Sequence, residues 1–170
     1  MPIELDDDMR AVIAAAHLCF AATVTADGRP NLSPKGTVRA WDARHIFFLD
    51  IASPGTRRNL EHNGWLEINL VDQQSRRGYR FSGRAAVHRA GPVFDEATRR
   101  VFAEEGVAYP AESVILMAIE RAAALVSPGY MHVGDEWAMR EHWRARRAAL
   151  DADFEAHVRV RGPWPGQGGK

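Results

Sequence analysis

The sequence has one cysteine, no net charge and no long run of apolar residues, and each of these features excludes a class of protein. Cys19 stands alone, so the chain cannot form an internal disulfide. Lysine plus arginine number 22 and aspartate plus glutamate also number 22, which leaves no net field to attract nucleic acid or an anionic membrane. No stretch reaches the roughly 20 apolar residues of a membrane span. Any anion that the protein binds must therefore be captured locally.

The first residues also lack the features of a secretory signal. Three aspartates, Asp6, Asp7 and Asp8, stand where such a signal would be basic and then continuously apolar. We therefore expect a cytoplasmic protein that has neither a nucleic acid nor a membrane as its partner.

The common motifs of nucleotide-binding and hydrolytic enzymes are missing as well. The sequence contains no P-loop, no G-x-G-x-x-G after a strand, no G-x-S-x-G and no H-E-x-x-H. Its seven histidines are spread along the chain without two at metal-ligand spacing on one element. We expect no bound metal, and we interpret Cys19 as an ordinary core residue.

The length of 170 residues fits one domain, because domains cluster near about 100–150 residues. An apolar fraction of 46% and a charged fraction of 26% are typical of a globular protein. The last residues contain too much glycine and proline to fold by themselves. We therefore expect a single domain over residues 1–160 and a flexible tail over residues 161–170.

The periodicity of the apolar residues predicts a mainly β protein with flanking helices. Alternating or β-branched segments, bounded by turn signals such as Asp27-Gly28, predict strands over 19–25, 30–39, 45–51, 65–71 and 78–88. Helical spacing, with start and stop signals, predicts helices over 5–16, 53–64, 92–105 and 135–150, the second of only one to two turns. The apolar run at 112–125 fits either a strand or a helix by periodicity, and we interpret its β-rich core as a strand.

Six or so strands at hairpin spacing, with helices at the ends and one inserted late, describe a small, mostly antiparallel β-barrel. Pro34 interrupts the second strand, and a central, fully paired strand would not tolerate a proline. We therefore expect an edge strand, a bulge or a break at this position.

A candidate anion site follows the strand at 45–51. Ser53-Pro54-Gly55 leads into Thr56-Arg57-Arg58-Asn59. Free backbone N–H groups, the positive end of a helix dipole, a hydroxyl and two guanidinium groups would converge there, and this combination suits a phosphate dianion. Ser33-Pro34-Lys35-Gly36-Thr37 adds another cation and a glycine where a flat ligand could approach the backbone. The alternative is a solvated pair of arginines on a surface helix.

Five segments occur in an order that carries a family resemblance: Cys19 to Pro30, Ser33 to Gly36, Ile46 to Asp50, Thr56 to Leu60 and Gly83 to Ala85. Together they resemble the flavin-binding split-barrel family related to pyridoxamine 5′-phosphate oxidase, over roughly residues 15–90. The later Ser127-Pro128-Gly129-Tyr130 resembles a further feature of that family. The resemblance implies an FMN-binding split β-barrel, usually a homodimer with the cofactor at the subunit interface.

The resemblance also implies which residues hold the phosphate of FMN. Arg57 and Arg58 would bind it, with Thr56 beside them and Lys35 as a third contributor. The residue types agree with this role, because a dianion needs charge-assisted donors.

Further residues would surround the rest of the cofactor. Two neighbouring strands would lie along the isoalloxazine ring and the ribityl chain, through Lys35, Gly36, Thr37, Leu49 and Asp50. Tyr79 and Arg80 would begin the strand that reaches the cofactor of the partner subunit. Trp137 would form an aromatic wall, with plain helix packing as the alternative.

The leading hypothesis is therefore an FMN-dependent oxidoreductase acting on an unidentified small molecule, in which the flavin carries the redox chemistry. True pyridoxamine-phosphate oxidases end in a basic segment for the substrate phosphate, and this chain ends in Trp164 to Lys170 instead, so we do not expect vitamin B6 oxidation. Two alternatives remain. One is a deazaflavin- or haem-binding protein of the same fold, and the other is a flavin-binding protein without catalytic activity.

Overall fold

The computed structural model of the chain describes residues 3–16 and 18–161. Backbone contacts divide the chain into two compact units, which we call the strand unit (residues 1–72 and 77–126) and the helical unit (residues 73–76 and 127–170). The prediction of one domain over residues 1–160 stays a prediction. Residues 162–170 of the expected tail lie outside the described residues.

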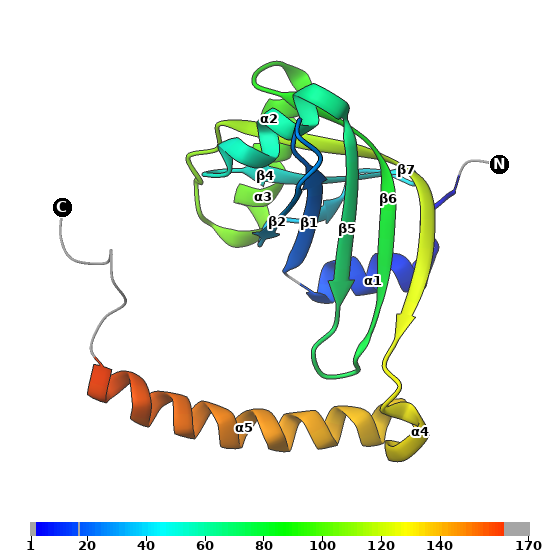
Figure 1. Ribbon diagram of the computed structural model, residues 1–170, viewed down its shortest axis with the longest axis vertical. Helices are drawn as coiled ribbons and strands as arrows, with labels where there is room; N and C mark the ends of the chain where they lie inside the picture. The colour runs from blue at the N-terminus through cyan, green and yellow to red at the C-terminus, as the bar shows by residue number, and fades with distance from the viewer. Residues whose placement is uncertain (1–2, 17, 162–170) are drawn as a thin grey trace. The chain divides into compact units, whose positions relative to one another are not determined.

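The strand unit is built on one antiparallel sheet. Among the described residues it has seven strands in the order β2-β1-β5-β6-β7-β4-β3, and in Figure 1 β4 runs across the direction of β1 and β5. The strands are β1 (Cys19–Val24), β2 (Pro30–Lys35), β3 (Arg39–Ala40), β4 (His45–Asp50), β5 (Trp65–Val71), β6 (Arg77–His88) and β7 (Ser113–Val126). The arrangement is a half-barrel with flanking helices, which confirms the expected split β-barrel.

Three local expectations for the sheet are confirmed. The first hairpin turns at Gly28, whose φ of 83° lies in the left-handed region that favours glycine. Pro34 lies in β2, an edge strand, so its missing N–H removes no bond from a second neighbour. The run from Ser113 to Val126 is a strand over its whole length, because β7 pairs with both β6 and β4.

The long pair β6 and β7 contains one irregularity, a register shift between Ser82 and Gly83. A Cβ atom placed on Gly83 would lie only 1.9 Å from the carbonyl oxygen of Ala118 on β7. The two backbones therefore approach more closely here than any side chain would allow, which explains the glycine in the Gly83-Arg84-Ala85 segment.

Three helices flank the sheet: α1 (Asp7–Ala16), α2 (Pro54–Asn63) and α3 (Pro92–Glu105). The expectation of one to two turns for α2 was wrong, since its ten residues make about three turns. Leu60 extends the helix because it is buried in the core, and Gly64 ends it in the left-handed conformation by donating its N–H to the Leu60 carbonyl.

Two apolar clusters fill the strand unit, one on each face of β4. The larger lies between α1 and the sheet, and it includes Ile13, Phe48, Phe81, Ile115 and Met117. The smaller packs α3 against β4 and β7, through Phe47, Leu49, Ala97, Val101 and Val114. Successive residues of β4 thus point to opposite faces, both of which are covered.

The curved sheet closes without a backbone ladder between its two ends. β2 is one edge strand and β4 lies next to the other edge, and no strand pairing joins them within residues 3–16 and 18–161. Side chains make the connection instead: the Thr37 hydroxyl, just after β2, accepts a hydrogen bond of 2.9 Å from the Leu49 N–H of β4. We call this junction, from Lys35 and Thr37 on one side to Leu49 through Ser53 on the other, the seam.

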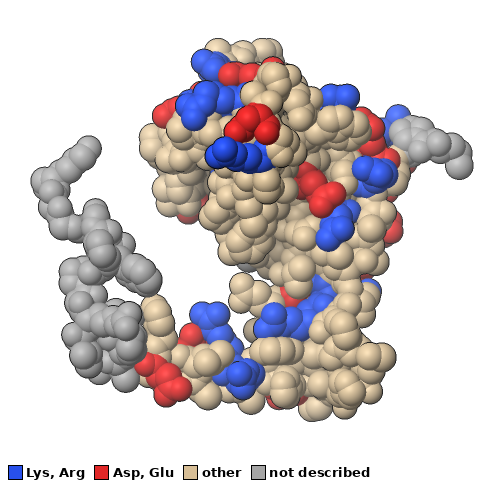
Figure 2. Space-filling model, viewed as in Figure 1, with Lys and Arg blue, Asp and Glu red and all other residues tan. Residues whose placement is uncertain are grey.

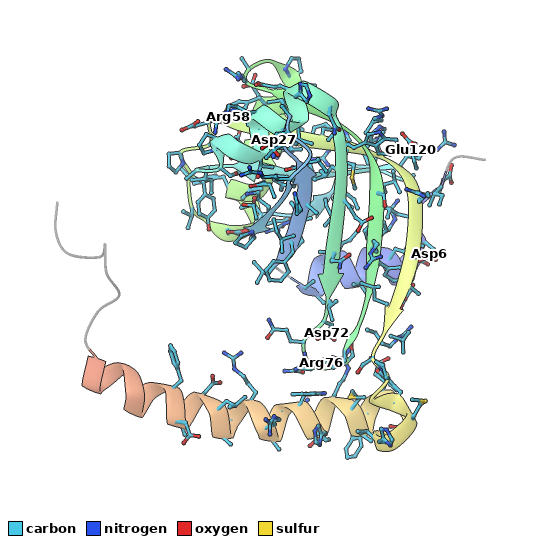
Figure 3. All side chains as sticks on the ribbon, viewed as in Figure 1. Asp6, Asp27, Arg58, Asp72, Arg76 and Glu120 are labelled. Carbon is cyan, nitrogen blue, oxygen red and sulfur yellow. The ribbon has the colours of Figure 1, made fainter. Side chains whose placement is uncertain are left out.

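The helical unit holds α4 (Tyr130–Val133) and α5 (Glu136–Arg161), which continues eleven residues beyond the predicted end at residue 150. Inside this unit the Arg76 guanidinium lies 3.7 Å from the centre of the Trp143 ring, and the Tyr130 hydroxyl donates to the Ser75 carbonyl at 2.6 Å. Figure 3 shows Arg76 directed toward α5. None of the helices described is both long and apolar enough to cross a membrane.

Candidate functional site

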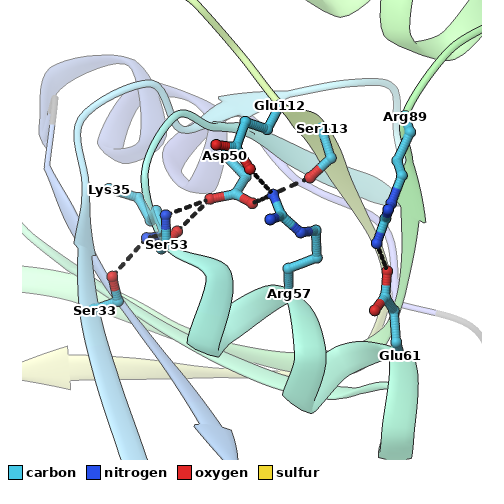
Figure 4. A network of polar contacts seen from close by, with 9 residues as sticks. All are labelled: Ser33, Lys35, Asp50, Ser53, Arg57, Glu61, Arg89, Glu112 and Ser113. Carbon is cyan, nitrogen blue, oxygen red and sulfur yellow. Dashed lines mark hydrogen bonds and ion pairs between the residues drawn. The ribbon is translucent and has the colours of Figure 1, made fainter.

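Lys35 forms the centre of a polar cluster at the seam. It is the last residue of β2 and is only 6% exposed. Its Nζ donates to the Ser33 hydroxyl at 2.6 Å and to the Ser53 hydroxyl at 2.8 Å, so it bridges β2 and the start of α2 (Figure 4). Burial lowers the pKa of the Lys35 amine, and the nearby Asp50 carboxylate opposes this shift.

Asp50, the last residue of β4, supplies the buried anion of the cluster. Its side chain is 1% exposed. One oxygen accepts hydrogen bonds from the Ser53 N–H, at 2.9 Å, and from the Ser53 hydroxyl, and the other accepts from the Ser113 hydroxyl at 3.2 Å and from Arg57 Nη1 at 2.8 Å. The carboxylate is thus held by Ser53 at the start of α2, by Arg57 within α2 and by Ser113 of β7, as a buried charge must be.

Arg57, in the first turns of α2, contacts two carboxylates with one nitrogen. Its Nη1 lies 2.8 Å from Asp50 Oδ2 and 2.6 Å from Glu112 Oε2 (Figure 4). The hydrogen bond with Glu112, together with the charge of Asp50, raises the pKa of the Arg57 guanidinium. The guanidinium therefore stays cationic throughout the range of pH in which the protein is folded.

A second set of hydrogen bonds fixes α2 against the strands. The Thr23 hydroxyl of β1 accepts from Asn31 Nδ2 at 3.1 Å and from Asn59 Nδ2 at 2.9 Å. The same Asn31 amide lies 3.3 Å from the Thr56 hydroxyl. Thr56 is 2% exposed, so its hydroxyl serves to hold the helix rather than facing the surface. These bonds set the direction in which Arg57 leaves the helix.

A hollow of about 460 Å³ opens beside the cluster, within the usual size range of small-molecule sites. Its lining residues are Ser33, Pro34, Lys35, Gly36, Thr37, Leu49, Ile51, Ala52, Ser53 and Tyr109. A second hollow of about 360 Å³ shares Leu49 and Tyr109 with the first and has Phe102 and Val107 in its wall. The structure therefore places Lys35, Gly36, Thr37 and Leu49, four of the predicted residues, around one space.

Asp50, Thr56 and Arg57 belong to the polar region at the start of α2 without lining this hollow, and none of the other predicted residues in the described part of the strand unit lines it. Arg58 is exposed on α2 (Figure 3). Tyr79 and Arg80 leave β6 on opposite faces, because neighbouring residues of a strand alternate. Tyr79 stacks on Phe81 and its hydroxyl donates to Asp8 at 2.5 Å.

Arg80 points to the outer face of the sheet, where its Nε lies 3.3 Å from Glu67 Oε1. Trp137 belongs to the helical unit and is 73% exposed. Their roles beside a cofactor stay predictions.

Several residues of the cluster were not among the predicted site residues. Ser33 was within reach of sequence analysis, because it lies two positions before Lys35 and so shares its face of the strand. Glu112, Ser113 and Tyr109 carry no local signal. They follow α3 in the sequence and reach the site only because β7 pairs with β4, with Asp50 opposite Ser113.

The charges outside the cluster show no single sign. On the face of the strand unit visible in Figure 2, lysine and arginine side chains alternate with aspartate and glutamate. Among residues 3–16 and 18–161, no three histidine, cysteine, aspartate or glutamate side chains form a group that could hold a metal ion. The cluster at the seam is thus a local arrangement of two cations, two carboxylates and several hydroxyls in a surface of mixed charge.

Comparisons with known proteins place the chain in a family. The model of the family described as pyridoxamine 5′-phosphate oxidase matches residues 5–125. HupZ of Group A Streptococcus is 32% identical, with a TM-score of 0.65 over 72% of this chain and 95% of that one. A comparison with curated protein sequences finds no match.

More distant structures share the fold. An FMN-binding protein from Syntrophomonas wolfei, 17% identical, gives a TM-score of 0.60 over 70% of this chain and 84% of its own. The haem storage protein HutZ from Vibrio cholerae, 18% identical, gives 0.57 over 73% and 95%. From the family model and the 32% identity to HupZ, the chain belongs to the pyridoxamine 5′-phosphate oxidase family.

Proposed function

We propose that the protein is an FMN-dependent oxidoreductase whose cofactor binds at the seam. One observation carries the proposal: the Lys35 amine, the Ser53 hydroxyl and the Arg57 guanidinium are joined in one hydrogen-bonded cluster beside a hollow of about 460 Å³. When bound, FMN supplies hydride transfer, which none of these side chains performs. The chain itself would capture the phosphate, orient the ring and keep water away.

The donors of the cluster suit a phosphate. An ammonium, a guanidinium and a hydroxyl provide charge-assisted and neutral hydrogen bonds, and the first turn of α2 adds the positive end of a helix dipole. Arg58, exposed on the same helix, would approach the phosphate from the solvent side. Leu49, Gly36 and Thr37 would then lie along the ring and the ribityl chain.

The same residues are less suited to haem, the ligand of HutZ. Haem iron in proteins is held by histidine, cysteine, methionine or tyrosine. Of the described residues that line the hollow, Tyr109 alone is of these types, and its hydroxyl is engaged with Glu105 Oε2 at 2.7 Å. The donor set thus favours a phosphate-bearing flavin, or a deazaflavin, over haem.

We also propose that two copies associate through the outer face of β1, β2 and β5. The apolar side chains on this face include Phe20, 46% exposed, and Leu32, 66% exposed, around a hollow of about 300 Å³. Val24 and Trp65 extend the apolar surface, and exposed apolar patches of this kind mark interaction sites. Arg80 lies on the same face, so it, rather than Tyr79, is the residue we expect to reach toward the partner.

The first experiment is the absorbance spectrum of the purified protein, with mass identification of any released chromophore. Titration of the apoprotein with FMN and with riboflavin then isolates the contribution of the phosphate. Loss of a charged hydrogen bond costs about 1.5–3 kcal/mol, so Lys35→Met or Arg57→Ala should weaken FMN about 10- to 150-fold and riboflavin much less.

Arg89→Ala is the matched control, because Arg89 is 62% exposed and pairs with Glu61 of α2 outside the hollow (Figure 4). Equal affinities of the wild-type protein for FMN and riboflavin would contradict the phosphate site. A Soret band in the spectrum would identify haem as the cofactor instead of FMN, and the mass of a deazaflavin would identify that cofactor. Tight FMN that reduced nicotinamide and other donors fail to reduce would indicate a flavin carrier instead of an enzyme.

A further inference from the structure

The two carboxylates on Arg57 differ sharply in how they are held. Both contact the same nitrogen, Nη1, but the Asp50 side chain is 1% exposed and the Glu112 side chain is 55% exposed. A guanidinium with two carboxylates on one nitrogen has one more anion than its own charge balances, and it belongs to the cluster that would bind the phosphate under the proposed function.

Asp50 cannot leave this position without a large cost. It is buried, and it also accepts hydrogen bonds from the N–H and the hydroxyl of Ser53 and from the hydroxyl of Ser113. Moving it would leave three donors without their acceptor and would take from Arg57 its buried carboxylate partner. Its carboxylate is therefore a fixed support that keeps Arg57 directed toward the seam.

Glu112 is held differently. Its backbone is anchored, since its N–H donates to the Asp50 carbonyl at 2.8 Å. Its carboxylate, however, contacts only Arg57 among the residues that the structure describes. Because 55% of the Glu112 side chain is exposed, water can replace this contact when the carboxylate rotates outward, so the rotation costs much less than moving the buried Asp50.

The charges of the cluster explain why this difference matters. Lys35 and Arg57 are cations, and Asp50 and Glu112 are anions, so the four groups cancel while Glu112 is in place. A phosphate that approaches the cancelled cluster meets no net attraction. Once Glu112 turns away, one positive charge is uncovered at the nitrogen that Glu112 occupied.

We propose that Glu112 is a built-in competitor for the phosphate, and that Asp50 is the positioning residue of Arg57. The proposal rests on the phosphate site of the proposed function. In the free protein the Glu112 carboxylate contacts Arg57 Nη1. The incoming phosphate takes the place of that carboxylate, while Asp50 keeps its contact with Arg57. Two carboxylates on one guanidinium thus have opposite effects on the affinity for FMN.

The test measures FMN affinity by quenching of flavin fluorescence in Glu112→Gln and Asp50→Asn, with Glu120→Gln as the matched control. Glu120 is an exposed glutamate of β7 outside the cluster. Because the half-exposed Glu112 carboxylate is hydrated once it leaves Arg57, its competition is modest, and we expect Glu112→Gln to tighten FMN about threefold to tenfold and to leave riboflavin unchanged. Asp50→Asn should weaken FMN, and Glu120→Gln should change neither ligand.

The outcomes distinguish the competitor role of Glu112 from the FMN site itself. Unchanged or weaker FMN binding by Glu112→Gln would overturn the competitor role while leaving the FMN site in place. This arm does not depend on Asp50→Asn, whose buried substitution can impair folding. If no variant binds FMN, inorganic phosphate becomes the probe: a rise in melting temperature that is larger in Glu112→Gln supports the competitor role without FMN. Absence of that rise would overturn both.

Discussion

Arg57 is expected to stabilise the free protein as well as bind a ligand, and the substitution Arg57→Ala tests this in the absence of any cofactor. The guanidinium is the cation in direct contact with the buried Asp50 carboxylate, at 2.8 Å. Its removal leaves that charge with hydrogen bonds from serine groups only. Arg58, its neighbour on α2, is exposed and supports no such buried group.

The size of the effect follows from what Asp50 retains. Breaking a buried ion pair by removing one partner costs about 3–5 kcal/mol. Asp50 keeps its donors from Ser53 and Ser113, and Lys35 remains close, so we expect about 2–3 kcal/mol for Arg57→Ala. Arg58→Ala should change the free energy of unfolding by no more than about 0.5 kcal/mol, as for other surface sites.

Urea unfolding of the apoprotein, followed by tryptophan fluorescence, measures these differences. A double-mutant cycle with Asp50→Asn removes the buried charge first, so Arg57→Ala should then cost about 1 kcal/mol or less. A coupling between the two sites within about 0.5 kcal/mol, as found for independent residues, would refute the reasoning. So would equal destabilisation by Arg57→Ala and Arg58→Ala.

Two further predictions concern the scaffold. Gly83→Ala should lower the free energy of unfolding by about 3 kcal/mol or more, because its Cβ would lie 1.9 Å from the Ala118 carbonyl oxygen. In Gly55→Ala the new Cβ would lie 3.8 Å from its nearest neighbour, so this control should not destabilise the protein. Urea unfolding of the two variants measures the difference. The hydrogen bond to Asp8 raises the pKa of Tyr79 to about 12 from 10.0, so the folded protein holds a proton that the unfolded chain loses between these values. Stability should therefore fall as the pH rises through this window, and Tyr79→Phe should remove that part of the fall; an unchanged pH profile would contradict the assignment.

Sequence analysis succeeded where the signal is local. The strands β1, β4 and β5 alternate or are β-branched over six or seven residues, and each was predicted within one residue of its bounds. Pro34 indicated an edge because of what a proline lacks, without any knowledge of the neighbouring strands. Lys35 and Arg57, which the structure joins through Ser53 and Asp50, were singled out by their residue type and by the helix start at Ser53-Pro54.

It failed where the information is tertiary. Nothing near Glu112 in the sequence indicates that it meets Arg57, because the contact depends on the pairing of β4 with β7. The buried role of Thr56 was likewise invisible, since it requires Asn31 of β2 beside it. Tyr79 is a different case: strand alternation alone separates it from Arg80, and that signal was in the sequence.

The seam is a place where the sheet can open locally. Side-chain hydrogen bonds of Lys35 with Ser53 and of Thr37 with Leu49, rather than a ladder, join the end of β2 to β4 and to the residue before α2. Parting the two edges therefore breaks few bonds and leaves every pairing of the described strands intact. Local openings of this kind need far less free energy than global unfolding. A ligand bound there would span both edges and hold them together, so hydrogen exchange of the Leu49 amide, whose N–H is bonded to Thr37 across the seam, should slow when the site is filled.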